Sequence, residues 1–185
     1  MKTIEIEYRA MMSEKQYEDL LAFLSKNGED LGEDDKQVYF FVLEDKLLKV
    51  TENLSQKKAK ITLKLTRIGQ GSAFEEIEFP IQLDDSKKAV SLFKHLGYDY
   101  LLEPTIKRHN FMYKGIEFAV KYSKTWGFHC ELEIIVDDVK HQQEAEKKIR
   151  EVAKQLKLKI MTDEELTQFT KNVEKNYVHS PEATI

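Results

Sequence analysis

The stretch Ile4-Glu5-Ile6-Glu7-Tyr8-Arg9 alternates apolar and ionisable residues with a period of two. This pattern is typical of a β-strand with one apolar face and one ionisable face. Glu5, Glu7 and Arg9 then share a face, with neighbours about 7 Å apart at a rise of roughly 3.4 Å per residue. The arrangement returns in Cys130-Glu131-Leu132-Glu133-Ile134, again with two glutamates at i and i+2. Because two carboxylates at this spacing can share a divalent cation, the paired Glu-x-Glu strands are the main functional signal.

Composition predicts a single domain of 185 residues with a real hydrophobic core. The net charge of −4 argues against a generic nucleic-acid binder, and we expect no nucleic acid among the partners. No apolar run approaches the roughly 20 residues that a membrane helix needs, so no membrane partner is expected either. Cys130 is the only cysteine, which excludes a disulfide framework and suits a reducing cytoplasm. No signal peptide is visible, so a cytoplasmic protein is expected, and a homodimer is left open.

Residue patterns along the chain predict mostly β-structure. Ser13-Glu14-Lys15-Gln16 resembles a capping box at the start of a helix that ends near Asn27-Gly28, and Ser86 is the expected N-cap of a second helix. The acidic segment 29–36 is interpreted as a solvated connector. Further helices are expected at 141–156 and 163–172, and strands at 4–9, 37–42, 47–52, 61–66, 74–81, 101–111, 116–122 and 130–134.

Several of the predicted strands carry ionisable residues of both signs opposite an apolar face. Lys64 lies between Thr62 and Thr66 on one face of its strand, and Glu76 and Glu78 share a face of the next. An antiparallel sheet with one solvated face would explain a single exposed lysine. Antiparallel strands of this number also close into barrels, and a barrel with its charged faces inward forms a polar tunnel. The residues alone leave both alternatives open.

The ordered series of motifs resembles a known family. Glu5-x-Glu7-x-Arg9 is similar to the E-x-E-x-K signature of the CYTH domain, or triphosphate tunnel metalloenzyme superfamily. The likeness continues through about residue 134, in the segments Gln37-Val38-Tyr39-Phe40, Ile61-Thr62-Leu63-Lys64, Glu76-x-Glu78, Leu96-Gly97-Tyr98, Lys107-Arg108 and Trp126-Gly127 before Glu131-x-Glu133. The resemblance implies a mainly β (α+β) fold, a closed eight-stranded antiparallel barrel with flanking and C-terminal helices. Residues 1–185 would form one domain, with the barrel at about 1–137, a helical segment at about 138–178 and a frayed tail at 179–185.

The resemblance also implies roles for individual residues. One or two Mg²⁺ or Mn²⁺ ions would be held by Glu5, Glu7, Glu131 and Glu133. Phosphate oxygens would be contacted by Arg9, Lys49, Lys64 and Arg108, with Lys121 as a further contact. Glu76 and Glu78 would complete the acidic lining. The expected activity is divalent-metal-dependent hydrolysis of inorganic tripolyphosphate, a nucleoside triphosphate or thiamine triphosphate by in-line attack of water, in which Glu5, Glu7, Arg9 and Glu133 are catalytic.

Three positions depart from the family's pattern. Arg9 stands where lysine is usual, and Thr51 stands where a second strand arginine is common. Lys121 falls where many members carry a metal-binding aspartate. A cation at that position would weaken a second metal site or add a phosphate contact. The alternatives are therefore a non-catalytic module that binds a nucleotide or polyphosphate, and a class IV adenylyl cyclase.

Overall fold

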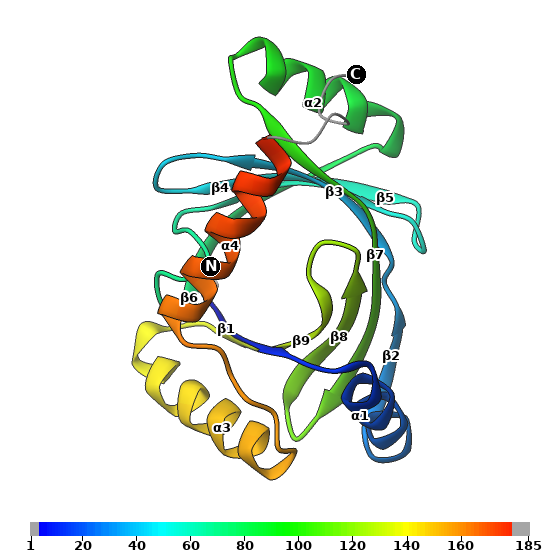
Figure 1. The fold of residues 1–185 in the computed structure, drawn as a ribbon, viewed down its shortest axis with the longest axis vertical. Coiled ribbons are helices and arrows are strands. Elements are labelled where there is room, and N and C mark those ends of the chain that lie inside the picture. The colour runs from blue at the N-terminus through cyan, green and yellow to red at the C-terminus, as the bar shows by residue number, and fades with distance from the viewer. Residues whose placement is uncertain (1–3, 179–185) are drawn as a thin grey trace.

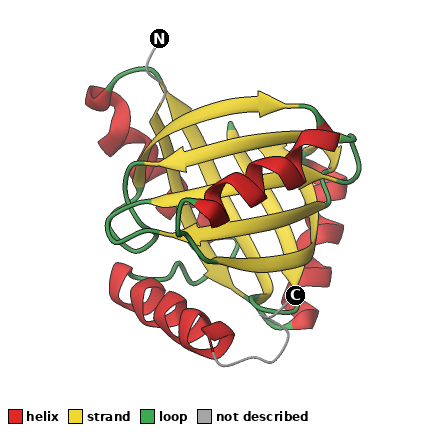
Figure 2. Ribbon diagram, turned by 90° about the horizontal axis from the view of Figure 1, so that it is seen from above, coloured by secondary structure: helices red, strands yellow, loops and turns green. Residues whose placement is uncertain are grey.

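The computed structural model describes residues 4–178, which fold into a closed antiparallel barrel (Figures 1 and 2). Eight strands close the barrel in the order β7-β3-β4-β5-β6-β1-β9-β8, and β8 pairs with β7. They are β1 Ile4–Met11, β3 Lys36–Val42, β4 Leu47–Asn53, β5 Lys58–Lys64, β6 Ala73–Ile81, β7 Tyr100–Tyr113, β8 Ile116–Ser123 and β9 Gly127–Val136. The prediction of an eight-stranded antiparallel barrel is confirmed.

The long strand β7 closes the barrel by changing partners along its length. Its first half pairs with β3, from Tyr100 opposite Phe41 to Ile106 opposite Lys36. Its second half pairs with β8. The second half of β7 no longer pairs with β3. Its edge on that side pairs instead with a ninth strand, β2 (Glu29–Glu33). The segment 29–36 is therefore not the solvated connector that its acidic composition suggested.

Four α-helices lie outside the barrel in the described part of the chain: α1 Glu14–Asn27, α2 Ser86–His95, α3 Gln142–Gln155 and α4 Asp163–Val178. Two short 3₁₀ turns, Leu83–Asp85 and Val139–His141, precede α2 and α3. The capping box predicted at Ser13 is present, with the hydroxyl accepting from the Gln16 backbone N–H. Ser86 is not an N-cap, because Asp85 takes that position and the Ser86 hydroxyl donates to Glu52.

The hydrophobic core lies between the barrel wall and the helices, because the alternating strands place their apolar faces outward. Ile6, Phe118 and Leu132 are fully buried and form one cluster with Ile149 of α3. A second cluster joins Tyr39, Phe41, Leu48 and Val50 to Val90 of α2. The opposite faces of the same strands are left to line the barrel interior with charged residues.

Helix α4 lies across one end of the barrel (Figures 1 and 2). Its bounds extend beyond the predicted 163–172 and reach Val178, and the predicted frayed tail 179–185 lies outside the described residues. Arg67 in the loop between β5 and β6 forms an ion pair with Glu174 of α4. The Thr167 hydroxyl donates to the Gly69 carbonyl over 3.2 Å. No helix among residues 4–178 combines the length and apolarity that crossing a bilayer requires.

Candidate active site

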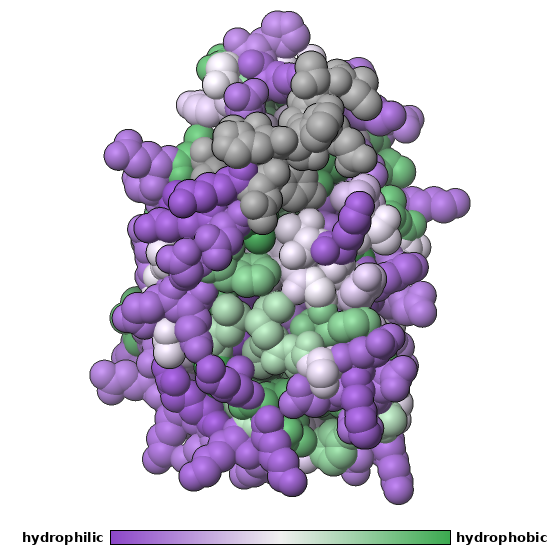
Figure 3. Space-filling view, in the orientation of Figure 1, coloured by the Kyte–Doolittle hydropathy of each residue, from purple (hydrophilic) through white to green (hydrophobic). Residues whose placement is uncertain are grey.

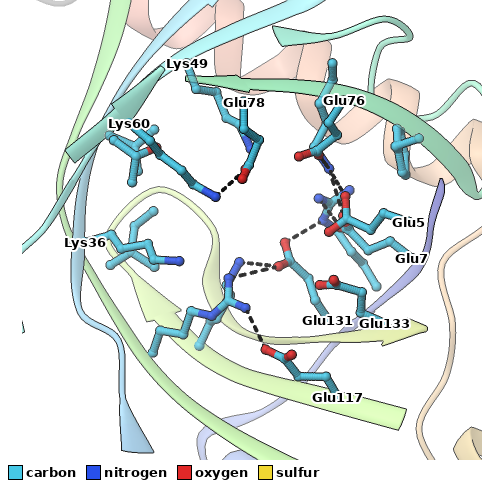
Figure 4. A pocket seen from close by; sticks show the side chains of 18 of the residues that line it. Glu5, Glu7, Lys36, Lys49, Lys60, Glu76, Glu78, Glu117, Glu131 and Glu133 are labelled. Atoms are coloured by element: carbon cyan, nitrogen blue, oxygen red, sulfur yellow. Dashed lines mark hydrogen bonds and ion pairs between the residues drawn. The ribbon is translucent and has the colours of Figure 1, made fainter. Parts of the chain in front are cut away.

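The barrel interior contains a cavity of about 360 Å³ lined mainly by ionisable side chains (Figure 4). Among the described residues, its lining includes seven bases, Arg9, Lys36, Lys49, Lys60, Lys64, Arg108 and Lys121, and seven acids, Glu5, Glu7, Glu76, Glu78, Glu117, Glu131 and Glu133. The volume falls in the usual range of small-molecule sites. Burying so many charges of both signs inside a barrel costs free energy, because each charge loses its hydration. The arrangement therefore indicates a site for a charged ligand and does not indicate a source of stability.

Three glutamates form one row across neighbouring strands. Glu133 of β9 lies directly opposite Glu7 of β1 on one side and opposite Glu117 of β8 on the other. Like charges placed directly opposite one another destabilise a sheet. Burial, together with the negative charges of Glu5, Glu7 and Glu117, raises the pKa of Glu133 to about 9. The ionised form of Glu133 is therefore disfavoured by its neighbours, and a bound cation would relieve that repulsion.

Glu131, two residues earlier on the same face, has the opposite environment. Its Oε1 accepts from Arg9 Nε at 3.0 Å, and its Oε2 is paired with Lys121. Arg108 Nη1 lies 3.9 Å from Oε2. Although burial alone would raise the pKa of Glu131, the positive charges of Lys121, Arg9 and Arg108 hold it well below its ordinary value. Glu131 is thus an ionised carboxylate with both oxygens engaged.

Lys64 is surrounded by carboxylates. Its ammonium lies 2.8 Å from Glu5, 3.0 Å from Glu7 and 2.7 Å from Glu76. Burial opposes the charged form, but the three carboxylates raise the pKa of Lys64 above its ordinary value. The Lys64 side chain, only 4 % exposed, therefore acts as a resident counter-ion of the acidic residues in the absence of any other cation.

Basic side chains gather on other parts of the cavity wall. Burial first, and then the charge of Arg108, lowers the pKa of Lys36 to about 8 despite its ion pair with Asp34. Burial and the charge of Lys64 lower the pKa of Lys49 to about 8. Among the described residues, none forms an ion pair with Lys49. These ammonium groups are held close to other cations in a desolvated site, which favours a polyanionic ligand.

Asp34 fixes the basic side of the cavity from behind. It is 8 % exposed, and it pairs with Lys36 over 2.6 Å and with Arg108 Nε over 3.4 Å. Asn53 and Asn110 also donate to its carboxylate. Asp34 therefore holds two cations in the cavity wall, although it lies in no periodic sequence pattern that would have predicted this role.

The carboxylate donor set fits a hard divalent cation at one part of the cavity. Glu5, Glu7 and Glu133 offer oxygens in a place where negative charge is in excess, and oxygen ligands suit Mg²⁺ or Mn²⁺. Within residues 4–178, no three acidic, histidine or cysteine side chains are yet gathered around one point. Lys64 contacts both Glu5 and Glu7, so a metal ion held by these two carboxylates would have to displace that ammonium. The role of Glu131 as a metal ligand stays a prediction, because its oxygens face cations.

All eleven site residues named from the sequence line this one cavity. Lys36, Lys60 and Glu117 also line the cavity and were not predicted. Strand parity would have indicated two of them, since Glu117 shares a face with Lys121 and Lys60 shares one with Lys64. Cys130 points into the outer core, where burial raises the pKa of its thiol. Trp126 packs at the turn between β8 and β9, with its ring 4.7 Å from that of Phe169.

Fold and site together define an antiparallel barrel with an ionic tunnel, a class of protein suited to polyanionic ligands. Residues 3–167 match the family model of the CYTH domain, and the chain belongs to that family. No functionally curated protein matches the sequence.

Solved structures of similar fold come from several organisms. The PH1012 protein of Pyrococcus horikoshii is 25 % identical with a TM-score of 0.69, over 88 % of this chain and 99 % of its own. A conserved hypothetical protein from Pyrococcus furiosus is 30 % identical with a TM-score of 0.67, over 88 % and 94 %. A putative adenylyl cyclase from Hippeastrum, described as having a dominant triphosphatase activity, is 13 % identical with a TM-score of 0.59, over 85 % and 89 %. At that identity the likeness shows the fold alone.

Proposed function

We propose that the barrel binds a triphosphate together with a divalent cation and hydrolyses its terminal phosphoanhydride bond. The observation that carries the proposal is the presence of two groups of charge in one cavity: carboxyl groups at Glu7 and Glu133, which lie opposite one another, and basic side chains at Lys36 and Lys49. A single small ion would satisfy only one of these groups, whereas a metal–polyphosphate complex satisfies both.

Each part of the site would contribute in a defined way. Glu5, Glu7 and Glu133 would hold Mg²⁺ or Mn²⁺, which supplies charge neutralisation and a means of activating water. Binding of the ion would displace the proton that Glu133 carries below pH 9. Arg108 and Lys36 would grip phosphate oxygens and stabilise the charge that develops on the leaving oxygen.

The reaction itself needs no covalent nucleophile. Water would attack the terminal phosphorus in line with the bridging oxygen, and that oxygen would leave with the electron pair of the broken bond. The Hippeastrum fold relative is described as a triphosphatase, which agrees with this reaction. A non-catalytic polyphosphate-binding module is the second candidate, and the pairing of Lys121 with Glu131 favours it, because a cation stands beside that carboxylate.

The proposal is tested by incubating the protein with Mg²⁺ or Mn²⁺ and tripolyphosphate, ATP or thiamine triphosphate, and measuring phosphate release. Cyclic AMP is assayed in the ATP reaction to test for a cyclase. Glu5→Gln and Glu133→Gln are each expected to abolish metal-dependent turnover while the circular dichroism spectrum is retained. Lys124→Gln, on the exposed turn after β8, serves as the matched surface control. Full activity in either glutamate variant would contradict the assignment of the metal site, and tight binding without turnover would favour the binding module.

A further inference from the structure

In the described part of the chain, one outer face of the barrel has no helix packed on it. Helix α2 packs on β4, α3 packs on β9 and β1, and α1 packs on β2, β7, β8 and β9. In the sheet, β4 is followed by β5 and β6. Figure 2 looks onto α2 and shows strands that run beside this helix with no helix drawn over them. The outward side chains of β5 and β6 are therefore left at the surface.

This uncovered face is apolar. Ile77 and Phe79 alternate along β6 with glutamates that line the cavity, so their side chains point outward. They are 56 % and 66 % exposed. Opposite them on β5 lie Leu63 and Ile61, which are only partly buried. These four residues form the β5–β6 face.

Helix α2 borders the β5–β6 face with an apolar row of its own. The Lys94 ammonium lies 5.8 Å from the centre of the Tyr100 ring, which turns that side of the helix toward β7. Leu92 and Leu96 lie on the opposite side and are 58 % and 62 % exposed. Because side chains four residues apart lie one above another on a helix, Lys88, Leu92 and Leu96 form one row, the α2 row. Figure 3 shows mainly hydrophilic side chains at the top of the molecule, where α2 lies, which agrees with an apolar row on one side of the helix only.

The β5–β6 face has room for one helix. Two neighbouring strands are about 10 Å wide together, and a helix with its side chains is about 10 Å across. The exposed side chains of β6 and of the α2 row leave roughly 500 Å² of apolar surface in water, which is at the upper end for a monomeric protein. Since a stable interface buries about 800 Å² on each partner, this apolar surface would supply more than half of one.

We propose that the β5–β6 face binds the α2 row of a second copy of this chain, and that the two copies form a twofold-symmetric dimer. The α2 row extends over about 12 Å at 1.5 Å per residue. On β6, Glu75 shares the outward face with Ile77 and Phe79, and these three residues extend over about 14 Å. Each run has one charged end followed by two large apolar side chains, and the two charges are opposite. Lys88, which is 79 % exposed beside Asp85 of its own chain, therefore meets Glu75 of the second copy. The two leucines meet Ile77 and Phe79.

A second copy fits this surface because one chain supplies both halves of the contact. In a twofold interface, residue i meets residue j of the other copy and j meets i. Helix α2 contains three lysines and no acidic residue, whereas β6 contains three glutamates and no basic residue. Packing α2 on β6 of the other copy therefore opposes unlike charges, while packing the two α2 helices on one another alone would oppose lysines. The two helices then lie side by side in one layer between the two barrels.

Sedimentation velocity of the full chain tests the dimer. The wild type is expected to sediment as a dimer. Phe79→Glu and Leu92→Glu should each weaken self-association at least about 100-fold, because each buries an unpaired charge in the contact. Leu31→Glu is the matched control, since Leu31 is also exposed (44 %) but lies on β2, which borders neither β5 nor β6. It should remain a dimer, and circular dichroism should show that all three variants are folded.

Charge exchange tests which residues meet. Lys88→Glu and Glu75→Lys should each weaken the dimer at least about tenfold, because each places like charges opposite one another. When the two variants are mixed, a heterodimer should form in which both charge pairs are restored. The mixture should therefore sediment as a dimer at concentrations where each variant alone is monomeric. The two substitutions combined in one chain should also restore the homodimer.

The outcomes decide the proposal. A wild type that is monomeric at every concentration tested overturns it. So does a dimer that survives both Phe79→Glu and Leu92→Glu, or one that Leu31→Glu breaks equally. A mixture of the two charge variants that associates no more tightly than either variant alone overturns the pairing of the α2 row with β6. Because these residues lie outside the cavity lining, failure of the proposed function would leave the dimer standing.

Discussion

Two glutamates on one face of β9 are expected to respond in opposite ways to the same substitution. In metal-free protein, Glu133→Gln removes a carboxyl whose pKa is raised to about 9 by burial and by neighbouring glutamates. Glu131→Gln removes a carboxylate that is held ionised by Lys121 and Arg9. The side chains keep nearly the same shape in both variants, so the charge environment decides the result.

The magnitudes follow from proton linkage. Because the pKa of Glu133 is higher in the folded protein than its ordinary value of 4.5, its stabilising effect is complete below about pH 4.5 and is lost as pH rises through about 9. One pKa unit corresponds to about 1.4 kcal/mol, so the wild type should lose about 2 kcal/mol from this group between pH 7 and pH 9. Glu133→Gln should not show that loss. Glu131→Gln removes the ion pair of the buried Lys121 and one of the two carboxylates that pair with Arg9, and should cost about 3 kcal/mol or more across this range.

The assay is urea unfolding in the presence of a chelator at pH 7, 8 and 9, followed by circular dichroism. The free energy of unfolding of Glu133→Gln should exceed that of the wild type by a margin that grows with pH, while Glu131→Gln lies below both. Added Mg²⁺ should stabilise the wild type and have less effect on Glu133→Gln. Equal destabilisation by the two substitutions would refute the contrast between the acidic row and the paired carboxylate.

Four further outcomes can be checked, three with the variants Lys49→Met and Asp34→Asn and one with the wild-type protein. Lys49→Met should raise the free energy of unfolding by up to about 3 kcal/mol at pH 7, because the wild type must bury a charged ammonium there. The gain should shrink towards pH 10.5, where the lysine is neutral in the unfolded chain as well. A change in urea unfolding that does not depend on pH would contradict this. The same variant should weaken tripolyphosphate binding about 10- to 100-fold by calorimetry, since one charged contact is lost. Asp34→Asn should lower the pKa of Lys36 further below about 8, because it removes the carboxylate that stabilises the ammonium. KM for tripolyphosphate should then rise about tenfold at pH 8 and recover towards pH 6. A raised KM at both pH values would indicate a folding defect instead. The buried Cys130 thiol, with its raised pKa, should not react with a disulfide reagent until urea unfolds the chain.

Much of the site was predictable because a β-strand has a period of two. Once Glu5 and Glu133 were placed on inward faces, every second residue of their strands followed, and strand parity extends the same reasoning to Glu117 and Lys60. Closure of the barrel came from the resemblance to a family, since the alternation of Glu76 and Glu78 also suits an open sheet.

What the sequence could not supply is which charges meet across strands. Glu131 and Glu133 look equivalent in the chain, yet one lies opposite Arg9 and the other opposite Glu7. Register decides this, and register depends on the whole barrel. Asp34 lies in a short acidic segment without periodicity, so composition indicated a solvated loop, whereas its ion pairs with Lys36 and Arg108 arise only when β3 and β7 diverge.

The pairing of β1 with β9 has a consequence for how the protein acquires its site. Arg9 and Glu131 meet although they are 122 positions apart in the chain. Contacts of such long sequence range form slowly, because the loop between them must be closed before they contribute. During synthesis the acidic row does not exist until β9 has been made, so a chain interrupted before residue 131 lacks one side of the proposed cation site. Occupation of the proposed metal site would therefore report on completion of the fold, and metal added during refolding is expected to act only on the last kinetic phase.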